Sequence, residues 1–243
     1  MPLLLTIAGF LVGAFLIRLA NFLTNHWGIR CPYCQTPYKS WLAFKAIIFE
    51  RGRCTSCGAP YLSPYALAEV LTALTFVLIW RKFGLSLYTA FALLYNIAFI
   101  LLLLTDLSHR IIPDAVVYPA MALALVAEAL KGHVSFKNHL MGGGLAFLLF
   151  LAFYALGQAF MRWKSTEEVA FGMGDVKLAL LIGLILGYPK GLRALLAGVF
   201  FNGIVALWMI VRGMLSKRFN PLAPFPYGPG LIASFFIFWL LLP

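Results

Sequence analysis

Two aspartates, Asp106 and Asp175, stand at the ends of long apolar runs, where a charge is costly. A charge at the centre of a bilayer costs about 2.5–3.5 kcal/mol on insertion scales, so carboxylates near such positions are functional candidates. Two carboxyls brought together share a proton, which lets one activate a water while the other polarises a peptide carbonyl. The residues are therefore compatible with a hydrolytic pair in which Asp106 and Asp175 are catalytic.

Simpler structural roles for both aspartates are also open at this point. Asp175 is of a type favoured at a helix N-cap, and Asp106 could cap a turn. If the pair is catalytic, its neighbours become supporting residues, because glycines allow close approach of helices or of a bound peptide and a lysine supplies positive charge. These supporting residues are Gly172, Gly174, Lys177, Pro113 and Asp114.

Four cysteines lie in one hydrophilic stretch, residues 25–62, as two C-x2-C pairs separated by nineteen residues. This spacing is typical of a structural zinc site, because each pair turns two thiolates to one side and two pairs complete a tetrahedral shell. Two alternatives stay open: two disulfides, which would need an oxidising side of the membrane, and a redox site without metal. The predicted zinc ligands are Cys31, Cys34, Cys54 and Cys57.

The composition is that of a polytopic membrane protein, since 63% of the 243 residues are hydrophobic and only 11% are charged. Helices of about 20 apolar residues cross the hydrocarbon core. We expect an all-α protein with a first transmembrane helix at 1–24, a cytoplasmic zinc-binding loop at 25–62 and a transmembrane bundle at 63–243. Glu69, inside the second span, could pair with Arg18 of the first. The eight expected spans are roughly 3–24, 63–80, 84–105, 111–130, 141–161, 172–188, 191–212 and 226–242.

The net charge of +11 does not indicate nucleic acid, because the basic residues fall mostly between the apolar runs and act there as topology signals. One side of the predicted membrane collects Arg30, Lys39, Lys45, Arg51, Arg53, Arg110, Arg162, Lys164, Arg212, Lys217 and Arg218. The other collects Arg81, Lys82, Lys131, Lys137, Lys190 and Arg193. The excess favours a cytoplasmic cysteine loop with both termini outside. By parity of the spans, Asp106 and Asp175 share the face of that loop.

Several stretches, in order along nearly the whole chain, resemble the type IV prepilin peptidases, the bacterial branch of the GxGD membrane aspartyl proteases. "GMGDVKL" (172–178) is similar to the GxGDxKL element, and "DLSHRIIPD" (106–114) to the other aspartate element. "RGRCTSC" (51–57), "SPYALAEVLTAL" (63–74) and "PYGPGLIA" (226–233) also match family stretches. The segment at 13–31 departs from the family's GSFLNVVIxRLP motif, and "PYGPG" replaces the commoner PFGPF.

The resemblance implies cleavage of the basic leader of prepilins or pseudopilins at the cytoplasmic face of a bacterial inner membrane, with Asp106 and Asp175 as catalytic residues. It also implies N-methylation of the new N-terminus with S-adenosylmethionine, an activity associated with the cysteine-containing domain. The implied systems are type IV pili or type II secretion. Two other classes stay open: a proton-coupled transporter, since intramembrane carboxylates also relay protons, and a non-catalytic zinc-bearing scaffold.

Overall fold

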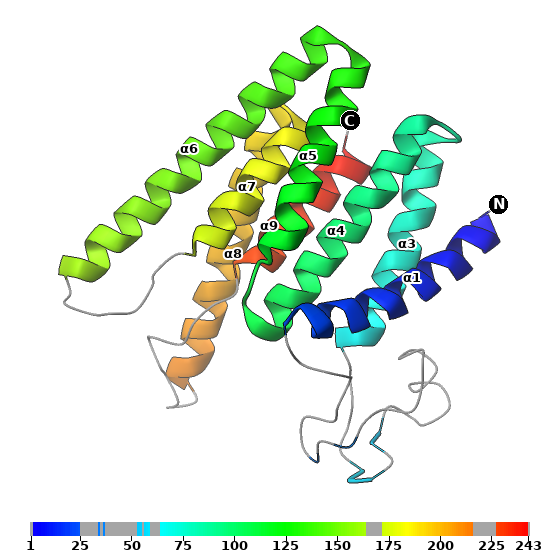
Figure 1. The fold of residues 1–243 in the computed structure, drawn as a ribbon. Helices are drawn as coiled ribbons and strands as arrows, with labels where there is room; N and C mark the ends of the chain where they lie inside the picture. The colour runs from blue at the N-terminus through cyan, green and yellow to red at the C-terminus, as the bar shows by residue number, and fades with distance from the viewer. Residues whose placement is uncertain are drawn as a thin grey trace. The chain divides into compact units, whose positions relative to one another are not determined.

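A computed structural model describes residues 2–24, 34, 36, 53–54, 56–58, 64–163, 172–215 and 227–242. Within these ranges the chain is almost entirely helical (Figure 1). Two compact units divide it after Val116. The elements are α1 (Pro2–Leu23), α3 (Pro64–Phe83), α4 (Leu87–His109), α5 (Asp114–Lys131), α6 (His133–Trp163), α7 (Met173–Leu186), α8 (Lys190–Leu215), α9 (Gly228–Phe236) and the π-helical turn η1 (Ile237–Leu241).

Every expected span coincides with a helix, and the all-helical membrane class is confirmed for the described residues. Four of these helices are long and apolar enough to cross a membrane, namely α1, α4, α6 and α8. The other four are shorter or carry more charge near their ends, so eight crossings stay a prediction. Helix α6 begins at His133, eight residues before the expected span at 141–161. The apolar pattern did not include these eight residues because the first two turns of the helix are polar.

In the first unit, α1 packs on α3, and α4 packs against both. Small residues allow the close contact of α1 and α3, since a β-carbon on Gly9 would lie 2.5 Å from Ala73 Cα and one on Gly13 would lie 2.8 Å from Glu69 Cα. The order of these contacts shows that α1 and α3 run antiparallel. Glu69 is fully buried and interacts electrostatically with Arg18 on α1.

In the second unit, α7 is the central helix and packs against α6, α8 and α9 (Figure 1). Nearly all of its residues are buried, which explains why the segment is apolar on all sides rather than on one face. Two glycines set the α6–α7 contact, because a β-carbon on Gly183 would lie 2.5 Å from the main-chain oxygen of Gly142. The two helices therefore meet backbone to backbone near the C-terminus of α7.

The second half of α8 is apolar and largely exposed. The large exposed side chains in this half and just before it are Phe200, Phe201, Ile204, Leu207, Trp208, Met209, Ile210, Val211 and Met214. A continuous apolar surface of this kind is rare on a protein surrounded by water. It suits contact with lipid, and the charge of Arg212, which stacks on Trp208 at 5.2 Å, marks the end of the apolar segment.

Candidate active site

Asp106 lies in the last turn of α4, within the first unit, and is only 5% exposed. The helix ends at Arg110, whose φ of 56° is left-handed and whose N–H donates to the main-chain oxygen of Asp106 at 2.8 Å. The chain then passes through Pro113 into α5, whose first residue, Asp114, is exposed. A buried carboxyl group therefore sits at the C-terminal end of an apolar helix.

Asp175 lies in the first turn of α7, within the second unit, and is 8% exposed. The N-cap position belongs to Gly172, which has extended backbone angles and accepts a hydrogen bond from the N–H of Asp175 at 3.1 Å. The hypothesis that Asp175 is itself the N-cap is therefore wrong. Its carboxylate lies three residues inside the helix, where the partial positive charge of the helix N-terminus attracts an anion.

Gly172 has a direct spatial reason to be glycine. A β-carbon at this position would lie 3.3 Å from Oδ2 of Asp175, which is closer than most real β-carbon contacts. The half-buried Gly174 follows in the first turn. The glycine pair adds no side chains to the backbone next to the carboxylate, and glycine allows another backbone to approach closely.

Lys177 extends toward α5 in the same unit. Its ammonium nitrogen lies 5.3 Å from the centroid of the Tyr118 ring, a cation–π distance. Nothing in the local sequence around Tyr118 predicts this contact, because the two residues come from different helices. Lys177 stands two residues after Asp175, so the contact links the N-terminal part of α7 to α5.

The start of α9 is fixed to the middle of α8. The Asn202 side-chain nitrogen donates to the main-chain oxygen of Tyr227 at 2.8 Å, and Asn202 is 3% exposed. Gly230 packs directly on the Asn202 side chain. The stretch that resembles the family's C-terminal motif therefore forms a helix start that is pinned by a buried amide, which the sequence did not single out.

Three of the four predicted zinc ligands lie together in the first unit. The sulfur atoms of Cys34, Cys54 and Cys57 are all within 4.8 Å of one another, and Cys34 Sγ and Cys54 Sγ are 3.6 Å apart. None of the three forms a disulfide. A tetrahedral thiolate shell with Zn–S bonds of ~2.3 Å places its sulfurs ~3.8 Å apart, so the arrangement fits such a metal ion. The fourth predicted ligand, Cys31, is outside the described residues.

The local structure around these cysteines also suits a metal site. The N–H of Gly58 donates to the oxygen of Cys54 at 2.9 Å, and Gly58 has a φ of 68°, so the second C-x2-C pair forms a tight turn. Hydrogen bonds from Thr36, which lies 3.2 Å from the sulfur, lower the pKa of the Cys34 thiol. A lowered pKa favours the thiolate form that binds metal.

Comparisons with known proteins agree with the order of these features along the chain. Residues 93–207 match the type IV leader peptidase family, and residues 7–83 match the bacterial peptidase A24 N-terminal domain. No solved structure matches significantly.

Among curated relatives, a prepilin leader peptidase/N-methyltransferase of Legionella pneumophila is 30% identical over 225 residues, which are 90% of this chain and 75% of the relative. The protein of that name from Bacillus subtilis is 26% identical over 98% of this chain and 93% of the relative. A type 4 prepilin-like proteins leader peptide-processing enzyme of Escherichia coli is 27% identical over 91% of this chain and 90% of the relative. With motifs, buried acids and relatives in agreement, this chain belongs to the type IV leader peptidase family.

Proposed function

We propose that this protein is an aspartic endopeptidase that removes the basic leader of type IV prepilins or pseudopilins at the cytoplasmic face of the bacterial inner membrane. One observation carries the proposal: the segment that matches the family, residues 93–207, holds both Asp106 and Asp175, each buried at the end of an apolar helix. The relatives' names supply the substrate class. Family membership also favours a peptidase over the transporter and scaffold hypotheses.

In the proposed reaction the two acids divide the proton transfers. Asp175 is at the positive end of α7, which attracts negative charge, whereas Asp106 is at the negative end of α4, which repels it. We assign Asp175 as the base that takes a proton from the attacking water, and Asp106 as the acid that protonates the carbonyl oxygen.

The tetrahedral intermediate then collapses with the reverse proton movements. The leaving nitrogen takes the proton held by Asp175 as the C–N bond breaks, and a hydroxyl of the intermediate returns its proton to Asp106 as the carbonyl reforms. Both acids end in their starting states. The scheme requires the two carboxyls to meet across one substrate, and that pairing is part of the proposal.

The proposed topology has eight crossings, with the cysteine loop, Asp106 and Asp175 on the cytoplasmic side. The lysine and arginine excess on that side supports this orientation. Prepilin leaders would then meet the two acids from the cytoplasm, while the apolar helix of the substrate stays in the bilayer. The exposed apolar second half of α8 would then lie in the bilayer, with Arg212 near the cytoplasmic surface.

The cysteine loop is proposed to hold one structural zinc ion with Cys31, Cys34, Cys54 and Cys57 as ligands. The closeness of three of these thiols supports the metal, and four thiolates would leave no position open for catalysis. A bound zinc would supply the folding free energy of a segment that is too small for an apolar core. The relatives' names support a second activity, N-methylation with S-adenosylmethionine.

The test is cleavage of a purified prepilin-like substrate in detergent or lipid, with S-adenosylmethionine present and the products read by mass spectrometry. We expect a cut behind the basic leader and, where methylation occurs, the added mass of one methyl group on the new N-terminus. Glu167→Gln serves as a control, since it removes a carboxylate from a hydrophilic stretch outside both aspartate elements. An intact substrate with wild-type protein would reject the proposed activity.

A further inference from the structure

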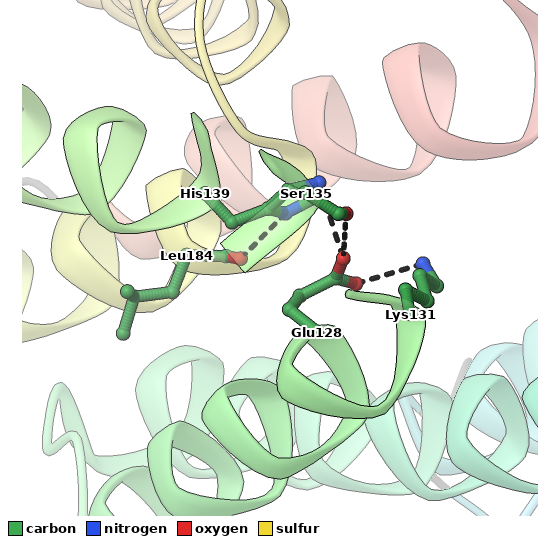
Figure 2. Close-up of polar contacts among 5 residues, drawn as sticks. All are labelled: Glu128, Lys131, Ser135, His139 and Leu184. Atoms are coloured by element: carbon green, nitrogen blue, oxygen red, sulfur yellow. Dashed lines mark hydrogen bonds and ion pairs between the residues drawn. The ribbon is translucent and has the colours of Figure 1, made fainter. Parts of the chain in front are cut away.

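A polar cluster around one buried carboxylate ties three helices together at the end of α7 opposite to Asp175 (Figure 2). At its centre is Glu128, near the C-terminus of α5 and only 2% exposed. Its Oε1 accepts from Lys131 Nζ at 2.8 Å, and its Oε2 accepts from the hydroxyl of Ser135 on α6, also at 2.8 Å. The carboxylate of Glu128 therefore joins α5 to α6.

His139 extends this cluster to α7, as Figure 2 shows. Its Nε2 lies 3.3 Å from Oε2 of Glu128, and its Nδ1 lies 2.9 Å from the main-chain oxygen of Leu184. Leu184 is in the last turn of α7, where carbonyl oxygens have no partner within the helix. One imidazole thus bridges a buried carboxylate of α5 and the C-terminal end of α7.

The geometry of His139 sets the number of protons in this bridge. A carbonyl oxygen can only accept, so Nδ1 carries a proton and donates it to Leu184. With a neutral imidazole, Nε2 would then present a lone pair to the carboxylate oxygen 3.3 Å away. The contact is attractive only when a further proton lies between Nε2 and Oε2. Lys131 and Ser135 both donate to Glu128, as they would to an ionised carboxylate. An imidazolium at His139 could donate to Glu128 from Nε2 and to Leu184 from Nδ1, so that every polar group of the cluster has a partner.

The bridge acts on the helix that carries Asp175. α7 has 14 residues and a length of ~21 Å, so its orientation is set by what holds its two ends. At the C-terminal end, the contact of Gly183 with Gly142 and the bridge through His139 fix it to α6 and α5. At the other end, Lys177 lies over Tyr118 of α5. Helix α5 is thus linked to α7 at both ends.

We propose that Glu128 and His139 are positioning residues, which hold α7 through a protonated bridge so that Asp175 is correctly placed for cleavage. The inference rests on the proposed peptidase function. Neither residue touches the reacting groups, since the bridge meets α7 at Leu184, at the far end of the helix from Asp175. In the proposed topology the bridge faces the outside of the cell.

The ends of the neighbouring helices carry other charged or titratable side chains. Among described residues these are His133 and Lys137 near the start of α6, Tyr188 after α7, and Lys190 and Arg193 in the first turn of α8. Lys190 donates to the main-chain oxygen of Leu242 at 2.9 Å. The imidazole of His139 contacts Glu128 on one side and Leu184 on the other.

The first part of the test compares His139→Ala with His133→Ala in the purified protein, using a prepilin-like substrate. His133 is an exposed histidine at the start of the same helix and provides a matched control. We expect His139→Ala to lower kcat roughly ten- to hundredfold with little change in KM, because small misplacements of catalytic groups are costly. His133→Ala should keep the wild-type kcat. Equal kcat values for the two variants would overturn the proposal.

The second part uses Glu128→Gln, which keeps the shape of the side chain. The amide nitrogen introduced by this substitution would donate to the lone pair of a neutral His139, while the amide oxygen would still accept from Lys131. This variant should therefore keep the wild-type kcat, whereas Glu128→Leu, which can neither accept nor donate a hydrogen bond, should lose as much kcat as His139→Ala. A Glu128→Leu protein with wild-type kcat would overturn the proposal.

An Asp175→Asn protein, measured beside these variants, separates this proposal from the proposed function. If Asp175→Asn cleaves like the wild type, the peptidase assignment fails. If Asp175→Asn is inactive but His139→Ala has wild-type kcat, only the positioning role fails. Should His139→Ala not fold, the kcat of Glu128→Gln relative to the wild type and to Glu128→Leu decides alone.

Discussion

Gly172 stands so close to Asp175 that a β-carbon at position 172 would lie 3.3 Å from the carboxylate oxygen Oδ2. The contact lies at the N-terminus of α7, where Gly172 occupies the cap position and Asp175 is the third residue of the helix. The glycine of the "GMGD" element is therefore explained by the space that the carboxylate occupies. The backbone angles of Gly172 are extended and open to any residue, so they give no separate reason for glycine.

Replacing Gly172 by alanine should displace the Asp175 carboxylate by a few tenths of an ångström. We expect kcat for leader cleavage to fall about tenfold, because a displaced catalytic group loses transition-state stabilisation. The melting temperature should change little. Gly144→Ala is the matched control, since a β-carbon there meets nothing within 4 Å and alanine favours the helix. A Gly172→Ala enzyme with wild-type kcat would show that Asp175 tolerates the added methyl group.

Gly230 should be intolerant of any side chain. A β-carbon on Gly230 would overlap Oδ1 of Asn202 and lie 2.5 Å from its Cγ. We expect Gly230→Ala to destabilise the protein by about 1–3 kcal/mol, as overpacked sites do. Denaturation in detergent measures this, with Gly203→Ala as control because that position is open.

The contact between Gly230 and Asn202 can be tested further with a double variant. Truncating Asn202 to alanine removes the overlapping atoms, although it also removes the hydrogen bond to Tyr227. The protein with both Gly230→Ala and Asn202→Ala should therefore be more stable than Gly230→Ala alone. If the loss of stability from Asn202→Ala adds to the loss from Gly230→Ala, the two residues do not meet as described.

Removing one cysteine should abolish binding of the zinc ion proposed for the loop but leave cleavage in place. We expect Cys57→Ser to lower the bound zinc, measured by elemental analysis, from about one ion per chain to a small fraction. A chelator should have the same effect on the wild type and should expose the loop to proteolysis. Methylation should be lost with the metal, while leader cleavage continues. Full zinc content in Cys57→Ser would exclude this residue as a ligand.

The helices could be predicted from the sequence because a long apolar run in a membrane satisfies its backbone hydrogen bonds most simply as a helix. The expected span at 84–105 corresponds to α4, and the span at 172–188 to α7. The boundary of α6 could not, since its first two turns carry His133, Lys137 and Asn138 and do not look apolar. The proximity of three cysteines followed from their spacing, and the electrostatic partnership of Glu69 with Arg18 was expected as well.

The contacts that hold the second unit together could not be predicted. His139 and Leu184 are 45 residues apart, and no local pattern relates them. Tyr118 and Lys177 are likewise far apart in the sequence, and only the tertiary fold brings their side chains together. Asp175 was also considered as an N-cap residue, but the N-cap of α7 is Gly172. Residue preference alone does not say which of several suitable residues begins a helix. Such details depend on tertiary packing.

The most direct measurement of the central claim is the rate of leader cleavage by Asp106→Asn, Asp175→Asn and the protein with both substitutions. Two acids that share one reaction act as a unit, so their losses do not add. We predict that each single variant loses at least about a thousandfold in kcat, and that the double variant is no slower than either. A single variant that cleaves at the wild-type rate would contradict the account, and so would losses that multiply in the double variant.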